Sequence, residues 1–368
     1  MVRDRRALIP WIVFIVAALP AMGGALGSAG VALLAPLSLR LAHRYDIDRR
    51  MIGLMVVHGA ASGNFSPLNV LGAIVAQAVA RNGLVMSSST LFLGNIAYNV
   101  VLGAVIFVVF GGLRLSRRVP ISTEAALAGG GRSVTGSHDL STSAGDPLID
   151  GSTTEAGEVP EQIERNPGRL RVEQLCTMAA ILAVAVAGLA FGLNIGLLAF
   201  GAAAVIHLLF PSSSGDAEKK IAWGVVLLVC GIVTYVAALQ RYGTVEAVGA
   251  AIGRLSTPLL TALLICVVGA ITSAFASSAG ILGAMIPLAV PFMARGEIDT
   301  TGMVVALAIS ATVVDATPFS TVGALVVANA EDEERPRIYR GLLLWGAAMV
   351  LTAPLLTWLV FVVAGFRI

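Results

Sequence analysis

Two short polar clusters interrupt otherwise apolar stretches of this chain. The first reads SGNFSPLN over 62–69, and the second reads VVDATPFST over 313–321. Their hydroxyl, amide and carboxylate oxygens, with backbone carbonyls at a helix break, are ligands that a small hard cation such as Na⁺ accepts. The N–H groups at the start of a helix instead attract an anion. Neither cluster contains Lys or Arg, so an anion bound here would depend on helix ends, amides and bound cations.

Small residues interrupt two further apolar runs, 7–43 and 258–294, near their middles. A single Ser or Thr on an apolar helix usually bonds back to a carbonyl one turn earlier, so the prediction concerns the clusters as a set. The candidate substrate-binding residues are Gly27, Ser28, Asn64, Ser66, Asn69, Ser277, Ser278, Thr317, Ser320 and Thr321. Possible Na⁺ positions lie near Ser28, Gly63 and Asn64, and near Ser278, Asp315 and Thr317.

The composition predicts where these clusters lie. Hydrophobic residues make up 57% of the 368 residues, and charged residues only 12%. Soluble domains carry about 25% charged residues, so a soluble enzyme and a disordered chain are disfavoured. The net charge is +2 and the basic residues form no cluster, which disfavours a nucleic-acid partner. The three cysteines lie far apart in apolar segments and are interpreted as inert core residues. We predict a polytopic membrane protein.

Two titratable residues are candidates for coupling transport to a cation. Asp315 is the one acid that we place near the middle of the membrane, where carboxylates are costly and functional by default. It would ligate Na⁺ or carry a proton. His58 precedes the first cluster and would titrate as well, although a histidine on an apolar helix is more often a packing residue. No cofactor besides Na⁺ or H⁺ is expected.

The predicted fold class is all-α, because apolar stretches of about 20 residues are typical of spanning helices. The runs 7–43 and 258–294 are interpreted as re-entrant hairpins. The stretches 51–80 and 302–330 are too long for one straight span of a bilayer core about 30 Å thick, so we predict helices broken at the polar clusters. Simple spans are predicted at 90–112, 174–192, 194–210, 221–240 and 341–364.

The distribution of basic residues predicts the orientation in the membrane. With the N-terminus in the cytoplasm, the cytoplasmic segments hold 19 of the 24 Lys and Arg residues, as the positive-inside rule requires. The C-terminus is then external, in a cytoplasmic (inner) membrane. These cytoplasmic segments are 1–6, 40–50, 113–172, 211–220 and 331–340. The polar stretch 119–172 is interpreted as a flexible cytoplasmic linker between a first part, 1–118, and a second part, 173–368.

The chain resembles itself at an offset of 251 residues. Positions 35–75 and 286–326 share ten identities over 41 ungapped positions, and Asn64 falls on Asp315. Five predicted crossings separate the two hairpins, so the repeats would be inverted, which is typical of secondary transporters. The counterpart of Gln174 would lie roughly 80 residues before Met1. We therefore expect the first repeat to lack its N-terminal spans, and a non-transporting truncated fragment is one alternative.

Several segments carry a family resemblance. GALGSAGVALLAPLSLRLA (24–42), MIGLMVVHGA (51–60), SGNFSPLNVLGAIV (62–75), ITSAFASSAGILGAMIPL (271–288) and SATVVDATPFSTVGALVVANA (310–330) resemble the MatC-type dicarboxylate (malonate) carriers. More distantly, the chain resembles the divalent-anion:sodium symporters of the ion-transporter superfamily. In that superfamily each hairpin tip carries a Ser-Asn-Thr motif that touches Na⁺ and a substrate carboxylate. The tips here fall at 26–28 and 277–279, and neither keeps the full triplet.

The resemblance implies a homodimer with a scaffold domain and an elevator-like movement of the hairpin domain. We therefore predict a secondary transporter of a small dicarboxylate, coupled to Na⁺ or H⁺. A Na⁺/H⁺-type cation antiporter of the same superfamily is the other transport hypothesis. An intramembrane protease is disfavoured, because the chain has no HExxH motif and only one acid predicted near mid-membrane.

Overall fold

The computed structural model describes residues 6–117, 172–191, 195–211, 223–244, 247, 257–275 and 278–365. Every regular element within these residues is helical, and none of them is a strand. The helical fold class is therefore confirmed for this part of the chain. The predicted linker at 119–172 lies outside the described residues except for Val172. Of the range 119–175, only the start of one helix, from Val172, is described.

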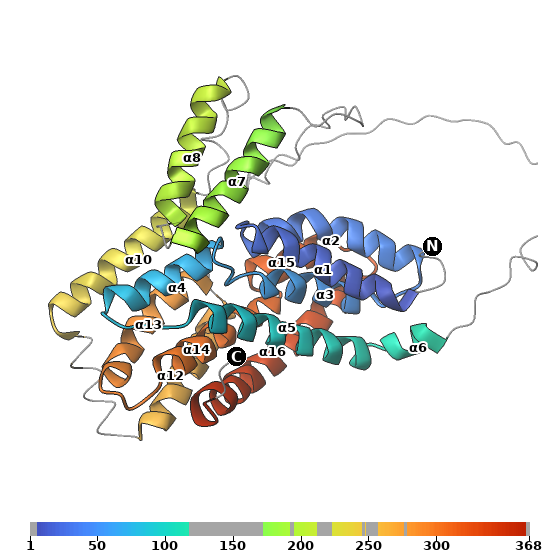
Figure 1. Ribbon diagram of the computed structural model, residues 1–368. Coiled ribbons are helices and arrows are strands. Elements are labelled where there is room, and N and C mark those ends of the chain that lie inside the picture. Colours follow the sequence, from blue (N-terminus) through green and yellow to red (C-terminus); the bar gives the residue numbers. More distant parts are fainter. Residues whose placement is uncertain are drawn as a thin grey trace, which may run out of the picture. The chain divides into compact units, whose positions relative to one another are not determined.

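The first part of the chain forms six α-helices, which Figure 1 traces in blue to green. The interruptions lie between the first and second helices and between the third and fourth. The bounds are α1 Ile9–Met22, α2 Gly27–Arg44, α3 Arg49–Ser62, α4 Val70–Arg81, α5 Ser88–Val109 and α6 Gly112–Arg117, after a short 3₁₀ turn at Arg6–Leu8.

The second part repeats this pattern after three further helices within the described residues. Those three are α7 Val172–Phe191, α8 Ile195–Leu209 and α10 Trp223–Arg241. The rest are α12 Pro258–Ser273, α13 Ser278–Ala294, α14 Thr300–Val313, the 3₁₀ turn η4 Val314–Ala316, α15 Thr321–Ala328, α16 Arg335–Thr357 and the π-helical turn η5 Trp358–Val363.

Helices α3 and α14 form the centre of two apolar cores. All residues from Met51 to Ser62 and from Gly302 to Val313 are buried. A helix that is apolar on all sides belongs in the interior rather than on a surface. Helices α1, α2 and α5 pack around α3, and α12, α13 and α16 pack around α14. Each core helix starts at an aspartate cap: Asp48 accepts from the Arg50 N–H at 2.8 Å, and Asp299 from the Gly302 N–H at 2.8 Å.

The two halves exchange their short helices. Helix α15, which follows the second break, packs against α2, and α4, which follows the first break, packs against α13. At the offset of 251 residues α4 corresponds to α15 and α2 to α13, so the packing partners correspond as well. The short helix after each break thus packs against the other half, so these contacts join the two halves.

Several helices have the composition of membrane spans. Among the described residues, Ser88–Val109, Thr300–Ala328 and Arg335–Val363 are long and apolar enough to cross a bilayer, by length and composition only. Large apolar side chains point outward from two of them, such as Val101 at 60% and Leu344 at 73% exposed. Exposed apolar side chains in this number suit contact with lipid. The described residues are therefore consistent with a polytopic membrane protein.

Candidate functional site

The first helix break is fastened to the link between α1 and α2. The Ser66 hydroxyl donates to the carbonyl of Met22 at 2.8 Å. The Asn69 amide donates to the carbonyls of Ala21 at 2.9 Å and Ala25 at 3.0 Å. The Asn69 Oδ1 accepts from the backbone N–H two residues later and so caps α4. Ser66 and Asn69, both predicted as substrate ligands, thus have these polar atoms engaged within the protein.

Asn64 differs from its neighbours in the same break. Its side chain is buried, and its Oδ1 has no hydrogen-bond partner; among the described residues, only the Tyr98 hydroxyl shares this state. The Oδ1 would lie 3.2 Å from a Cβ on Gly27, the first residue of α2. Leu26, at the N-cap of α2, provides no side-chain cap, and an uncapped helix start offers N–H groups to a ligand. Asn64 and Gly27 therefore meet at one point, and half-buried Ser28 is the next residue of α2.

The second break brings an acid to the start of α13. The Ser278 hydroxyl, on the first residue of that helix, donates to Oδ2 of the partly buried Asp315 at 2.6 Å. The Ser273 hydroxyl donates to the Ser278 oxygen at 3.2 Å. The Thr317 hydroxyl donates to the carbonyl of Ala274, just past the end of α12, at 2.9 Å. Predicted residues Ser278, Asp315 and Thr317 are thus gathered at one place.

The remaining predicted residues of the second half have different positions. Ser320 caps α15: its oxygen accepts from the Gly323 N–H at 3.1 Å, and its hydroxyl donates to the carbonyls of Thr317, at 2.9 Å, and Asp315. Thr321 is the first residue of α15 and is exposed. Ser277 lies outside the described residues.

The two breaks share backbone roles but differ in their chemistry. Positions that correspond at the offset of 251 residues do the same work: Ser66 and Thr317 bond back to the preceding helix pair, and Asn69 and Ser320 cap the next helix. The third matched pair, Asn64 and Asp315, differs. Asn64 faces Gly27, whereas Asp315 is hydrogen-bonded to Ser278. The first break therefore offers an uncharged amide, and the second offers an acid.

Matched glycines allow both turns to close. A Cβ on Gly72 would lie 2.7 Å from the Ser66 carbonyl oxygen, and a Cβ on Gly323 would lie 1.9 Å from that of Thr317. Neither distance leaves room for a side chain. The second break also lies beside the helix that leads into the first, because η4 packs against α3.

His58 belongs to a polar group that the sequence analysis missed. The imidazole is fully buried; its Nε2 accepts from the indole Nε1–H of Trp345 at 2.8 Å, and its Nδ1 lies 3.1 Å from Oδ1 of Asn99. Asn99 in turn contacts Asn95. The spacing of the two asparagines, four residues apart within an apolar span, places them on one helix face and was the available signal. The sequence around Trp345 gives no comparable signal.

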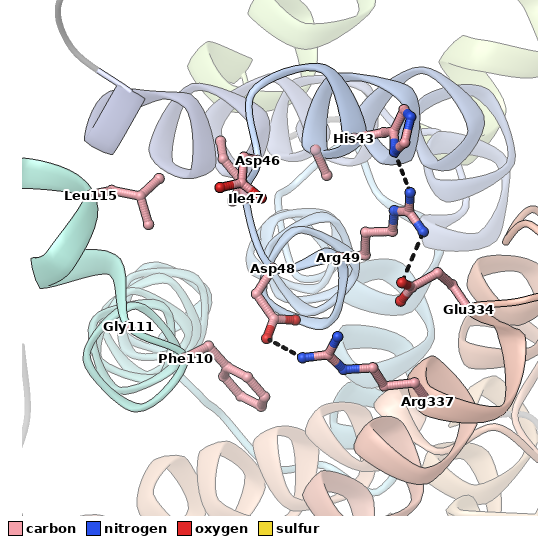
Figure 2. Close-up of a pocket in the computed structure, with 11 residues that line it drawn as sticks. His43, Asp46, Ile47, Asp48, Arg49, Phe110, Gly111, Leu115, Glu334 and Arg337 are labelled. Atoms are coloured by element: carbon pink, nitrogen blue, oxygen red, sulfur yellow. Dashed lines mark hydrogen bonds and ion pairs between the residues drawn. The ribbon is translucent and has the colours of Figure 1, made fainter. Parts of the chain in front are cut away.

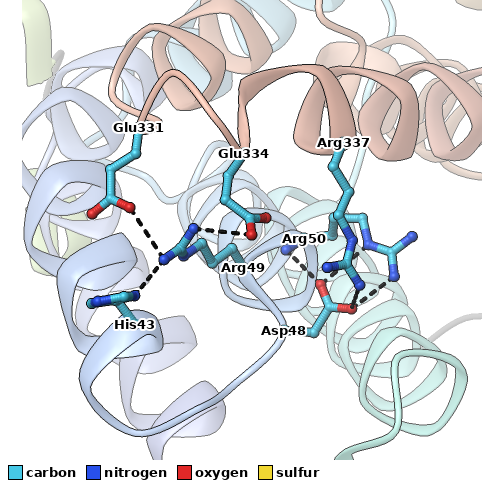
Figure 3. Close-up of polar contacts among 7 residues, drawn as sticks. All are labelled: His43, Asp48, Arg49, Arg50, Glu331, Glu334 and Arg337. Carbon is cyan, nitrogen blue, oxygen red and sulfur yellow. Dashed lines mark hydrogen bonds and ion pairs between the residues drawn. The ribbon is translucent and has the colours of Figure 1, made fainter.

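A charged cluster joins the turn before α3 to the segment before α16. Figure 3 shows Arg49 between Glu331 at 3.2 Å, Glu334 at 3.3 Å and the ring of His43. Asp48 pairs with Arg50 at 2.7 Å and with Arg337 at 3.7 Å. Five residues of the cluster border a cavity of about 360 Å³, shown in Figure 2: His43, Asp48, Arg49, Glu334 and Arg337. The cluster ties the segment that follows α15 to the start of α3 and, through His43, to the end of α2.

Asp48 makes the stability of this cluster depend on pH. Burial by itself would raise the pKa of Asp48, but the hydrogen bonds and charge of Arg50, with the charge of Arg337, hold that pKa below its ordinary value of 3.8. A carboxylate whose pKa is lowered by folding stabilises the fold above its unfolded pKa, and the stabilisation is lost as the pH falls through the folded value.

We expect Asp48→Asn, which keeps a helix cap, to lower the free energy of unfolding at pH 7 by about 1 kcal/mol. The difference from wild type should shrink as the pH falls below the ordinary Asp value. Thermal unfolding in detergent at a series of pH values measures this. Asp332→Asn, which removes the charge of a side chain that is 89% exposed, is the control and should change little. A deficit of Asp48→Asn that is constant with pH would contradict this account.

The described residues contain no group of three or more His, Cys, Asp or Glu side chains that would hold a metal ion. Residues 1–309 of the chain match the family model described as citrate transporter. Searches of curated proteins and of solved structures found no match.

Proposed function

The chain belongs to the citrate transporter family, and on this premise we propose that it is a secondary transporter of a small carboxylate anion. The family match supports a transporter rather than an enzyme, and a citrate-type anion as substrate. It supports the broad resemblance to ion transporters but not the malonate carriers specifically. Malonate and other dicarboxylates remain candidate substrates to be tested beside citrate.

The observation that carries the proposal is the difference between the two matched breaks. At the first, the unpartnered Oδ1 of Asn64 meets the uncapped start of α2 at Gly27. A hydroxyl or protonated carboxyl of the substrate would donate to this oxygen, and the N–H groups of the helix start would bind a carboxylate. Because the cluster 62–69 contains no Lys or Arg, binding of an anion would be helped by a cation that is transported with it.

The second break supplies the acid for that cation. Asp315 and the hydroxyls of Ser278 and Thr317 are oxygen ligands for Na⁺, or Asp315 takes up the proton. We propose Asp315 as the coupling residue. His58 is the other residue that the sequence predicts for this task, and in the structure its ring is hydrogen-bonded to Trp345 and Asn99.

Uptake into proteoliposomes tests the proposed function. Labelled citrate, malonate and succinate are offered separately under an inward Na⁺ gradient, an inward proton gradient, both, or neither. We expect accumulation of one or more of these anions that depends on one gradient and collapses when an ionophore removes it. Uptake of none of the three under any gradient would contradict the proposal.

A Na⁺/H⁺-type antiporter is the second candidate, because the Asp315–Ser278 pair would serve cation exchange as well. The same liposomes separate the two functions. Proton movement driven by Na⁺ in the absence of any carboxylate, followed with a pH-sensitive dye, would favour the antiporter. Proton or Na⁺ movement that requires the carboxylate would favour the symporter.

We also propose the inverted arrangement of the halves, with the turn at 44–50 cytoplasmic and the turn at 295–299 external. Support comes from the corresponding packing partners of the two halves. A membrane-impermeant maleimide should label Arg44→Cys only from the cytoplasmic side and Arg295→Cys only from outside, in a chain whose Cys176, Cys230 and Cys266 are replaced by Ala. Labelling of both from one side would contradict the inversion.

The resemblance to the wider superfamily further leads us to propose a homodimer in the cytoplasmic membrane. Native mass spectrometry of the purified protein released from detergent measures the oligomeric state directly. A monomer at all protein concentrations would contradict the proposal.

A further inference from the structure

A buried chain of hydrogen bonds runs from Trp345 to the end of α3. After the Trp345–His58 and His58–Asn99 contacts, the Asn99 amide donates to Oδ1 of Asn95 at 3.0 Å. The Asn95 amide then donates to the carbonyls of Ala61 at 2.9 Å and Ser62 at 3.0 Å. The His58, Asn95 and Asn99 side chains are completely buried. A polar atom of these side chains that had no hydrogen-bond partner would therefore lower the stability of the fold.

The direction of the chain is fixed at both ends. The indole of Trp345 is only a donor, and the backbone carbonyls at the other end are only acceptors. The Asn95 amide nitrogen must therefore face the carbonyls, and the Asn99 amide nitrogen must face the Oδ1 of Asn95. It follows that Nδ1 of His58 carries the hydrogen and Nε2 is the acceptor. A second proton on His58 would place two N–H groups against each other at Trp345.

We propose that this hydrogen-bond chain, which runs through His58, Asn99 and Asn95, holds the first break in the conformation that binds substrate. The inference rests on the proposed transport function. Ala61 and Ser62 are the last residues of α3, and Asn64 follows them by two residues. By donating to both carbonyls, Asn95 fixes the direction in which the polypeptide backbone leaves α3. It thereby fixes the position of the Asn64 amide, which faces the start of α2. His58 acts as a positioning residue that stays uncharged.

The matched position at the second break carries a different residue. The position that corresponds to Asn95 at the offset of 251 residues is Gly346. A Cβ there would lie 2.4 Å from the Thr317 methyl group, so α16 approaches the break closely and has no amide to offer it. The end of α3 is thus held by a side chain, and its two last carbonyls are already engaged.

Two substitutions of His58 test the positioning role. Gln at position 58 can accept from Trp345 through its oxygen and donate to Asn99 through its nitrogen, whereas Leu can do neither. We expect His58→Gln to keep uptake within about threefold of wild type with an unchanged pH profile. We expect His58→Leu to raise the KM for citrate on the order of tenfold, as loss of a supporting hydrogen bond does at other binding sites.

The same variants show which alternative holds if the inference is wrong. Loss of proton coupling in His58→Gln, with binding intact, would overturn the inference and identify His58 as a proton carrier. A His58→Leu protein with wild-type KM and only a lower unfolding temperature would overturn it in favour of a purely structural role. Asn95→Asp, which keeps the shape but repels the two carbonyls, should raise KM in the same way as His58→Leu.

A spectroscopic measurement stands apart from transport and remains informative if citrate is not carried. In ¹⁵N-histidine-labelled protein in lipid bilayers, the signal lost in His58→Gln identifies His58. We expect a protonated Nδ1 and an unprotonated Nε2 from pH 8 down to about pH 5. Trp345→Phe should shift the Nε2 signal alone. A charged ring in this range, or no response to Trp345→Phe, would overturn the inference.

Discussion

Proteoliposomes that contain Asp315→Asn should fail to accumulate citrate under a Na⁺ or proton gradient. The amide keeps the shape of the carboxyl group and still accepts from the Ser278 hydroxyl, which lies 2.6 Å from the acid. It loses the charge that attracts a cation within the low-dielectric membrane, and it cannot carry a proton. Removal of one partner of a buried charge pair costs about 3 kcal/mol, so we expect a loss on the order of a hundredfold in gradient-driven uptake.

The kind of residual activity in this variant identifies the coupling ion. An Asn at 315 resembles the protonated acid, so a proton-coupled transporter should still exchange internal for external citrate while it no longer accumulates it. A Na⁺-coupled transporter should lose exchange as well, because substrate and cation bind together. Asp332→Asn, at an exposed site on the loop before α16, is the matched control and should behave as wild type. Accumulation by Asp315→Asn at the wild-type rate would contradict the role of Asp315.

The sequence predicted the helical fold and the segments where polar residues collect, because apolar run length and Gly, Pro and polar clusters are local properties. It did not distinguish roles within a cluster. Ser66 and Asn69 were predicted as ligands, yet these side chains hydrogen-bond to carbonyls at the α1–α2 link. Asn64 has the same chemistry and is left without a partner at Oδ1. Which amide is engaged depends on contacts between segments more than 40 residues apart, and no local pattern contains them.

The links of the hydrogen-bond chain through His58 could not be predicted from the sequence for the same reason, although the spacing of Asn95 and Asn99 places both on one helix face. Its members come from α3, α5 and α16, and the link between Trp345 and His58 spans 287 residues. Repeat matching did predict that Asn64 and Asp315 correspond. It did not predict that Asp315 has a hydroxyl donor at Ser278 while Asn64 faces a glycine. The difference between Ser278 and Gly27 at one matched position therefore separates an engaged acid from an open amide.

Asn64→Leu is expected to make the protein more stable and less active. A buried oxygen without a partner costs about 1–3 kcal/mol, and the Oδ1 of Asn64 is such an atom. Leucine has a similar volume and removes that cost, so the unfolding temperature in detergent should rise by about 2–4 °C. Uptake of citrate should fall roughly tenfold to a hundredfold, the value of a hydrogen bond to a charged or strongly polar ligand group.

Asn69→Leu is the matched control, because Asn69 is also a buried asparagine of the same break and its side chain bonds within the protein. Two carbonyls accept from its amide, and its Oδ1 caps α4. Its loss should lower the unfolding temperature. If the unfolding temperature rises in Asn64→Leu and falls in Asn69→Leu, Asn64 is kept at a cost to stability. Selection for ligand binding produces such a residue, whereas selection for folding does not. If Asn64→Leu is instead destabilised like Asn69→Leu, or transports citrate normally, the binding role of Asn64 and the substrate site at the first break are wrong.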